Sequence, residues 1–186
     1  MTTTSTTVRP QLTHMGINVY DIAGMEAFYT SVLGLVVTDR GVGRTFKAQL
    51  VFLSSNPLSH HQLVLASGRD PESPRTSINQ ISFKVEDLDQ LRVMYRRVRD
   101  HGVEGLRPLD HGNAWSMYFP DPEGNNVEVY CDSPWYVSQP HGDPFDPEAP
   151  TEQIVAATEA VCRQDPDFMP IEQWRERLRA QLEGRA

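Results

Sequence analysis

Two stretches of the chain repeat the same pattern of hydrophobic and polar positions. Each begins with a short alternating segment, at residues 14–19 and 80–85, which predicts a strand with one buried face. Each continues with an Asp, a run of apolar residues at helical spacing and a closing Gly, at residues 21–34 and 87–102. Asp is a favoured helix N-cap and Gly a favoured residue just past a helix end, so each run predicts one amphipathic helix. The pattern indicates two copies of one structural unit.

A constant offset of 66 residues aligns the first strand and helix of the two copies. It pairs residues of the same or similar character, namely His14 with Gln80, Val19 with Val85, Asp21 with Asp87 and Tyr29 with Tyr95. A duplicated unit with a possible metal ligand at a matched strand position is more informative than any single motif in the chain.

Further strands complete each copy. In the first copy, residues 35–38, 48–53 and 61–65 have strand character, and in the second copy so do residues 115–119 and 126–130. The predicted order is therefore βαβββ, twice. Two such curved sheets packed together would form a cleft, and inward side chains at matched strand positions would meet in it.

These boundaries divide the chain into a central domain and two flanking segments. The domain covers residues 11–132, with modules at 11–66 and 78–132, and the fold class is α+β. Residues 1–10 are polar and predict a disordered tail. Residues 133–186 predict a Pro-rich loop followed by helices.

The C-terminal segment has a different character from the modules. Residues 133–150 hold five prolines and little periodicity, so we expect a loop. Thr151 is expected to cap a helix that runs to about Arg163, and a second helix is expected to begin near Pro170. That second helix carries an apolar stripe of Ile171, Trp174, Leu178 and Leu182. Such helices cannot bury their stripes alone, so we expect them to pack on the domain or on a second subunit.

Composition excludes several classes of protein. The net charge of −8 argues against a nucleic-acid partner, which needs a basic surface. The sequence holds no run of about 18 apolar residues, so we expect no membrane span. The N-terminus has no apolar signal region, and Cys131 and Cys162 do not form a disulfide framework or a CxxC pair. We therefore expect a cytoplasmic protein with two free thiols.

Several motifs carry a resemblance to a known family. They are Leu12–Met15, Phe28–Tyr29, Leu33–Leu35 and, most specifically, the stretch from Tyr118 to Glu128, which reads YFPDPEGNNVE. Over roughly residues 10–132 the chain resembles the vicinal oxygen chelate superfamily, which includes glyoxalase I, antibiotic-resistance binding proteins and type I extradiol dioxygenases. Residues 61–65 and 111–118 look most like single-domain extradiol dioxygenases.

The resemblance implies a metal site. In extradiol dioxygenases a His on the first strand of each copy and a Glu on the last strand bind Fe(II), and these positions match His14, Gln80 and Glu128. Such a ligand face leaves open positions for the vicinal oxygens of a catechol and for O2. Glu128 lies between Val127 and Val129, so alternation directs its side chain away from theirs.

The resemblance also assigns residues around the metal. His61 matches the family's acid/base His, and Tyr118 matches the Tyr that hydrogen-bonds a substrate oxygen. His111 is a candidate for a further His of the same pocket. The position in the first copy that corresponds to Glu128 is expected near His61 or Gln62.

Gln80 departs from the dioxygenase pattern, which has His at this position. An amide oxygen is a neutral and weaker ligand for Fe(II) than an imidazole. Either Gln80 binds the metal, as a Gln does in some glyoxalase I enzymes, or His61 supplies the second imidazole. We favour Gln80 as the positional match. The expected metal is Fe(II), with Mn(II), Zn(II) or Ni(II) as alternatives.

The sequence thus predicts a metal-dependent extradiol dioxygenase whose partners are a catechol-like aromatic substrate and O2. The alternatives are a glyoxalase-like lyase or isomerase that uses the metal as a Lewis acid, and a non-catalytic protein that binds a small molecule. The helical C-terminal segment and the sheet edges favour a homodimer.

Overall fold

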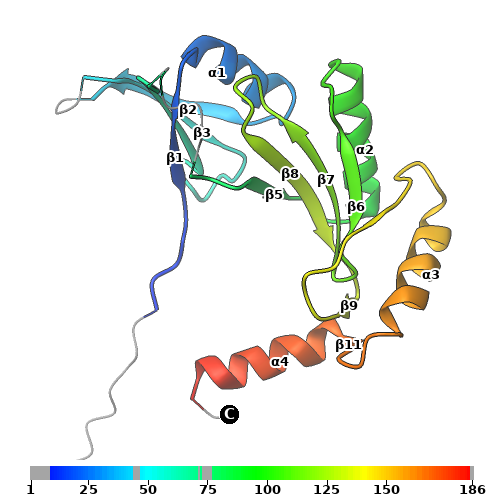
Figure 1. The fold of residues 1–186 in the computed structure, drawn as a ribbon. Helices are drawn as coiled ribbons and strands as arrows, with labels where there is room; N and C mark the ends of the chain where they lie inside the picture. The colour runs from blue at the N-terminus through cyan, green and yellow to red at the C-terminus, as the bar shows by residue number, and fades with distance from the viewer. Residues whose placement is uncertain (1–8, 44–46, 71, 73–76, 185–186) are drawn as a thin grey trace, which may run out of the picture. The chain divides into compact units, whose positions relative to one another are not determined.

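A computed structural model describes residues 9–43, 47–70, 72 and 77–184 of the chain (Figure 1). Most of the predicted N-terminal tail and part of the predicted linker lie outside these residues. The chain divides into two compact units, which we call unit 1 (residues 1–75) and unit 2 (residues 76–186). Each unit is described below by itself.

Unit 1 is the first predicted βαβββ module. Its elements are β1 (Met15–Val19), α1 (Ile22–Ser31), β2 (Val36–Val42), β3 (Gln49–Ser54) and β4 (Leu63–Ser67). The strands form one sheet in the order β1-β4-β3-β2, in which β1 and β4 run parallel and the other neighbours antiparallel.

The helix of unit 1 begins and ends as the sequence predicts. The Asp21 side chain accepts hydrogen bonds from the backbone N–H groups of Ala23 and Gly24. Past the helix end, Gly34 has a φ of 73°, a conformation that glycine adopts without strain. The side chains of Met25 and Tyr29 are fully buried beneath the helix.

Unit 2 contains the second module. Its elements are β5 (Ile81–Lys84), α2 (Leu88–Asp100), β6 (Arg107–Asp110), β7 (Ala114–Pro120) and β8 (Asn126–Asp132). The order β5-β8-β7-β6 repeats that of unit 1, again with a parallel first pair. This confirms the predicted α+β fold of two βαβββ modules. Strand β6 is the element that the sequence pattern did not locate.

The sheet of unit 2 has two different faces. Met117, Val127 and Val129 are buried on the face that contacts α2. Strand alternation places Tyr118 and Glu128 on the opposite face. The core of unit 2 therefore lies between its sheet and α2, and the other face is available for a site.

The C-terminal segment is more ordered than the sequence suggests. It contains β9 (Trp135–Tyr136), β10 (Asp143–Pro144), α3 (Thr151–Cys162), β11 (Met169–Pro170) and α4 (Ile171–Leu182). The expected loop over residues 133–150 is thus interrupted by two short strands, of which β10 pairs with β6 and β9 with β11. Backbone pairing with partners distant in the sequence leaves no local periodicity, so the pattern could not reveal it.

Thr151 is the first residue of α3 and not its cap. The N-cap is Pro150, which makes no side-chain capping bond. The Thr151 hydroxyl instead accepts a hydrogen bond from Arg92 of α2. The predicted extent of the helix is confirmed, but the prediction that Thr151 caps it is wrong.

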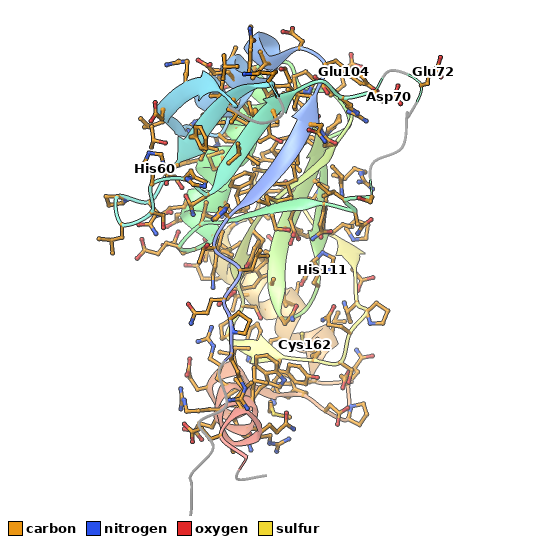
Figure 2. All side chains as sticks on the ribbon, turned by 90° about the vertical axis from the view of Figure 1, so that its left-hand side faces the viewer. His60, Asp70, Glu72, Glu104, His111 and Cys162 are labelled. Atoms are coloured by element: carbon orange, nitrogen blue, oxygen red, sulfur yellow. The ribbon has the colours of Figure 1, made fainter. Side chains whose placement is uncertain are left out.

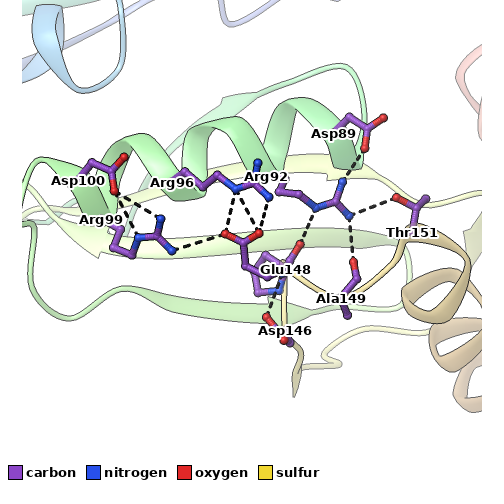
Figure 3. Close-up of polar contacts among 10 residues, drawn as sticks. Asp89, Arg92, Arg96, Arg99, Asp100, Asp146, Glu148, Ala149 and Thr151 are labelled. Carbon is purple, nitrogen blue, oxygen red and sulfur yellow. Dashed lines mark hydrogen bonds and ion pairs between the residues drawn. The ribbon is translucent and has the colours of Figure 1, made fainter.

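The segment docks on α2 through three arginines (Figure 3). Arg92 donates to the carbonyl oxygens of Pro147 and Ala149, at 2.9 and 3.1 Å. Arg96 binds both carboxylate oxygens of Glu148, and Arg99 lies 3.5 Å from the same carboxylate. The predicted packing of the first C-terminal helix on the domain is confirmed by the burial of Ile154 and Cys162 of α3.

Among the described residues, no helix combines the length and the apolar character needed to cross a lipid bilayer.

Candidate active-site residues

On the polar face of unit 2, three neighbouring strands each place one side chain in a row across the sheet. The strand registers place Ser82 of β5 beside Glu128 of β8, and Glu128 beside Tyr118 of β7. Glu128 is only 7% exposed, while its neighbours Val127 and Val129 are buried on the other face. The alternation predicted from the sequence therefore holds, and it directs Glu128 into a buried polar row.

Both carboxylate oxygens of Glu128 accept hydrogen bonds. Oε1 accepts from the Tyr118 hydroxyl at 2.5 Å. Oε2 accepts from the Ser82 hydroxyl at 2.5 Å and from Nε2 of Gln80 at 2.7 Å. Nε2 of Gln80 also lies 2.9 Å from the Ser82 hydroxyl. A buried carboxylate needs such donors, because burial without partners costs free energy.

Tyr118 is held as a neutral phenol. Burial, and then the hydrogen bond to the Glu128 carboxylate, raise the pKa of Tyr118 above its usual value of 10. The Tyr118 oxygen also lies 2.9 Å from Nε2 of His111. The phenol thus links a carboxylate to an imidazole.

His111 is fixed from its other side. Its Nδ1 lies 2.5 Å from the backbone carbonyl oxygen of His141. Because a carbonyl only accepts hydrogen bonds, Nδ1 carries a proton, and Nε2 is the nitrogen that faces Tyr118.

These side chains line a cavity within unit 2. Its volume is about 260 Å³, and its walls include His111, Asn113, Ser116, Tyr118, Glu128 and Gln139. The Ser116 hydroxyl is buried, and no hydrogen-bond partner for it lies in the described part of the chain. The walls of the cavity therefore include Tyr118 and Glu128 of the polar row.

Unit 1 brings two histidines together. The rings of His14 and His61 have centroids 4.4 Å apart and meet edge to face. Nδ1 of His14 lies 3.1 Å from the Thr13 hydroxyl, and the ring of His60 also contacts His61. Burial, and then the nearby His14 and His60, lower the pKa of His61 below 6.5. His61 is therefore neutral near pH 7 and keeps a lone pair for a proton or a metal.

The strand registers correct one expected position. In unit 1, Gly16 of β1 pairs with Val64 of β4, as Ser82 pairs with Glu128 in unit 2. The counterpart of Glu128 is therefore Val64, and not His61 or Gln62. Gln62 is engaged elsewhere, because its side-chain oxygen accepts from the backbone N–H of Ser55 at 2.9 Å.

The candidate residues thus form one group in each unit. His14 and His61 lie together in unit 1, and Gln80, Tyr118, Glu128 and His111 lie together in unit 2. A metal site that draws on both groups stays a prediction. Across the described residues, no three His, Cys, Asp or Glu side chains gather closely enough to hold a metal ion.

Two residues that contact the unit 2 group, Ser82 and Gln139, were not predicted from the sequence. Ser82 follows Gln80 by two positions on the same strand, so the period of two could have placed it on the same face. Gln139 comes from the C-terminal segment, and no local signal connects it with the cavity.

The two cysteines take no part in these groups. Cys131 and Cys162 are free and buried, as predicted from their spacing. Burial raises the pKa of Cys131 to about 12 and that of Cys162 to about 11, so both are protonated thiols that pack in the core.

Comparison with known proteins places the chain among dioxygenase-like sequences. It is 30% identical over 132 residues to biphenyl-2,3-diol 1,2-dioxygenase 3 of Rhodococcus globerulus, covering 68% of this chain and 66% of that one. It is 25% identical over 169 residues to biphenyl-2,3-diol 1,2-dioxygenase 2 of the same organism, covering 82% and 85%. It is also 31% identical over 130 residues to catechol-2,3-dioxygenase of Bacillus subtilis, which covers 66% of this chain and 42% of that protein.

Solved structures show the same fold. A glyoxylase/bleomycin resistance protein/dioxygenase domain from Frankia sp. matches with a TM-score of 0.56 and 21% identity, over 67% of this chain and 99% of that one. The fosfomycin resistance protein FosX from Listeria monocytogenes, solved with Mn(II), matches with a TM-score of 0.52 and 18% identity, over 66% and 93%. The family model of the glyoxalase/bleomycin resistance protein/dioxygenase superfamily matches residues 11–129. This match spans more than half of the chain, which therefore belongs to the glyoxalase/bleomycin resistance protein/dioxygenase superfamily.

Proposed function

We propose that this protein is a metal-dependent extradiol dioxygenase, which opens a catechol-like ring beside its vicinal hydroxyls. The observation that carries the proposal is the cluster of Glu128, Tyr118 and His111, which lines a cavity on the polar face of unit 2. Its support from outside the chain is that three relatives identified by sequence are named as dioxygenases of biphenyl-2,3-diol or catechol.

The proposed metal ligands are His14, Gln80 and Glu128, and the proposed metal is Fe(II). An imidazole, a carboxylate and an amide oxygen form a donor set that suits Fe(II) or Mn(II). Nε2 of Gln80 donates to Glu128, so the amide oxygen is the end of Gln80 that is suited to a cation. His61 is the competing ligand, because its ring lies against that of His14 within unit 1. When bound, the metal would acidify the two vicinal hydroxyls and bring O2 beside the substrate.

The chain's own residues supply the proton transfers in this proposal. His61, neutral because its pKa is lowered, takes the proton of one substrate hydroxyl and later returns it to the product. Tyr118, held as a phenol by burial and by Glu128, presents its oxygen to the substrate without losing its proton. His111 holds Tyr118 from the opposite side. Loss of such a positioned acid or base commonly reduces the rate by roughly 10²- to 10⁴-fold.

One experiment tests the proposal directly. The purified protein is loaded with Fe(II) and mixed with a panel of catechols in air, and absorbance in the visible range is followed. The yellow of a ring-fission product supports the proposal. Absence of both colour and O2 consumption across the panel, with iron shown to be bound, would overturn it.

The choice of ligands has its own test. Metal content and O2 consumption are measured for Gln80→His and for His61→Ala. If Gln80 is a ligand, the histidine variant binds Fe(II) more tightly, because imidazole is the stronger donor. If His61 is the ligand instead, His61→Ala loses the metal and Gln80→His changes little.

Gln80 itself favours a second candidate function. A neutral amide ligand suits a divalent metal that acts as a Lewis acid without redox chemistry, as in a glyoxalase-like lyase or isomerase. Bound metal without O2 consumption, together with conversion of a hemithioacetal of glutathione, would favour this alternative.

A further inference from the structure

The segment that follows the family domain contacts residues 110–112, which are His111 and its two neighbours in the chain. The family match ends at residue 129 and β8 ends at Asp132, and we call residues 133–184 the extension. Figure 2 shows His111 and Cys162, the latter from the extension, in the same part of unit 2. Asp110, His111 and Gly112 each contact the extension through a different set of atoms.

Asp110 is held by helix α3. The Thr158 hydroxyl donates to Oδ2 of Asp110 at 2.5 Å and accepts from the indole N–H of Trp115 at 2.8 Å. Oδ1 of Asp110 accepts from the backbone N–H of Gly112 at 2.8 Å. In addition, Asp143 of β10 pairs with Asp110 at the edge of the sheet. The residue before His111 is therefore fixed on both its side chain and its backbone.

Gly112 is held by close packing. Its φ is 74°, and a Cβ at this position would lie 2.5 Å from Cγ2 of Val137 and 3.1 Å from Sγ of Cys162. Its carbonyl oxygen accepts from the Ser133 hydroxyl at 2.5 Å. The extension therefore packs against the backbone itself on the far side of His111.

His111 is held by the amide of one residue, Gln139. Nε2 of Gln139 donates to the carbonyl oxygen of His111 at 2.8 Å, and Oε1 accepts from the backbone N–H of His141 at 3.1 Å. One side chain thus fixes the backbone of residue 141 relative to that of residue 111. The carbonyl of residue 141 is the group that lies 2.5 Å from Nδ1 of His111.

We propose that Gln139 is a positioning residue for His111, supplied by the extension from outside the family domain. By bridging the two backbones it sets the His141 carbonyl against Nδ1 of His111, which keeps a proton on that nitrogen and directs Nε2 to the Tyr118 oxygen. Its effect on catalysis rests on the proposed dioxygenase function, whereas its effect on the His111 ring does not.

Gln139→Glu tests the proposal with almost no change of shape. The carboxylate still accepts from His141, but it cannot donate to the His111 carbonyl and repels it. We expect kcat to fall roughly 10-fold with KM changed less than about 2-fold, at the low end of the losses seen when the outer hydrogen-bond partners of metal-ligating histidines are removed. The control is Gln164→Glu, because Gln164 is an exposed extension residue just past the end of α3 whose amide donates to the Ala160 carbonyl of that helix.

A second readout needs no activity. Nitrogen NMR of His111 in the wild-type protein is expected to show Nδ1 protonated, and Gln139→Glu is expected to show a lower occupancy of that proton in a protein that is still folded. Unchanged nitrogen shifts in a folded Gln139→Glu protein would overturn the proposal, and so would an equal loss of kcat in Gln164→Glu. If the occupancy of the Nδ1 proton falls in Gln139→Glu while neither the wild-type protein nor any variant cleaves catechols, the positioning role stands and the proposed function fails.

Discussion

The two units have the same strand order, yet the matched rows across their sheets have different chemistry. In unit 1 the row runs Asp39, Phe52, Val64 and Gly16, and in unit 2 it runs Arg107, Tyr118, Glu128 and Ser82. Phe52 and Tyr118 are both aromatic, and each has a histidine ring against it, His61 and His111. Where unit 2 has the Glu128 carboxylate and the Ser82 hydroxyl, unit 1 has the apolar Val64 and Gly16.

The same strand order therefore presents different side chains in the two units. In unit 1 the rings of His60 and His61 pack against Phe52, and Val64 stands beside Phe52 at the position that Glu128 has in unit 2. In unit 2 the carboxylate is surrounded by donors, and the extension fixes the histidine beyond them. Unit 1 therefore holds its histidines by ring contacts, and unit 2 holds a buried anion by hydrogen bonds.

The largest effect is expected from Glu128→Gln, which removes the buried carboxylate that unit 1 lacks at the matching position, Val64. The variant keeps the shape and removes the anionic ligand, so we expect loss of bound metal and a fall in kcat/KM of roughly 10³-fold. Metal analysis and O2 consumption measure both. The matched control is Val64→Ala, at the same position of unit 1, which should retain metal and activity. Full activity in Glu128→Gln would contradict the proposed site.

Tyr118→Phe gives unit 2 the aromatic residue of unit 1. It removes the hydroxyl between Glu128 and His111, so we expect kcat to fall roughly 10²-fold. Urea unfolding should show a loss of about 1.5–3 kcal/mol, the usual contribution of a hydrogen bond to a charged group. Phe52→Tyr is the reverse change in unit 1, where Val64 occupies the position of Glu128, and we expect no gain of activity. A Tyr118→Phe enzyme with wild-type kcat would show that the phenol only packs.

The sequence predicted the parts of this comparison that depend on short-range pattern. The 66-residue offset located both first strands and both helices, and period-two alternation directed Glu128 away from Val127 and Val129. The same reasoning missed β6, because its residues, Arg107 to Asp110, include a proline and show no clear alternation. It also misplaced the counterpart of Glu128, since the offset at the last strand is 64 and not 66.

The remaining parts depend on contacts between distant residues. Gln139 meets His111 across 28 residues, and Thr158 meets Asp110 across 48. Neither contact leaves a period or a motif in the sequence, because each joins one side chain to a partner chosen by the tertiary fold. A pattern can place a residue on a face of a strand, but it does not say which segment will cover that face.

A smaller effect is expected from Thr158→Val, which separates the extension from Asp110. The variant leaves the buried Trp115 N–H without its acceptor and removes one of the donors to the Asp110 carboxylate, so we expect a loss of about 1–3 kcal/mol in urea unfolding. Thr30→Val in α1 of unit 1 is the matched control, since the Thr30 hydroxyl bonds only to carbonyls of its own helix. Equal losses in the two variants would mean that Thr158 acts only within α3.

The smallest effect concerns the ion pair of Glu148 and Arg96, by which the extension docks on α2. The hydrogen bond from Arg96 lowers the pKa of Glu148 below 4.5. A lowered pKa in the folded state stabilises the protein above the unfolded pKa, and this stabilisation is lost as the pH falls through the folded value. Glu148→Gln should therefore lower the melting temperature slightly near pH 7, and its difference from the wild-type protein should shrink as the pH falls below 4.5.

Glu26→Gln is the matched variant in unit 1, because Arg40 lowers the pKa of Glu26 in the same way. Both variants should show the same pH dependence of melting, since both pairs lie near the surface. Only Glu148→Gln should also speed hydrogen exchange at the backbone N–H of His111, which bonds to the Ala114 carbonyl within the hairpin that the extension covers. If Glu26→Gln speeds this exchange as much, the ion pair stabilises the protein in general, and docking of the extension is not what distinguishes unit 2.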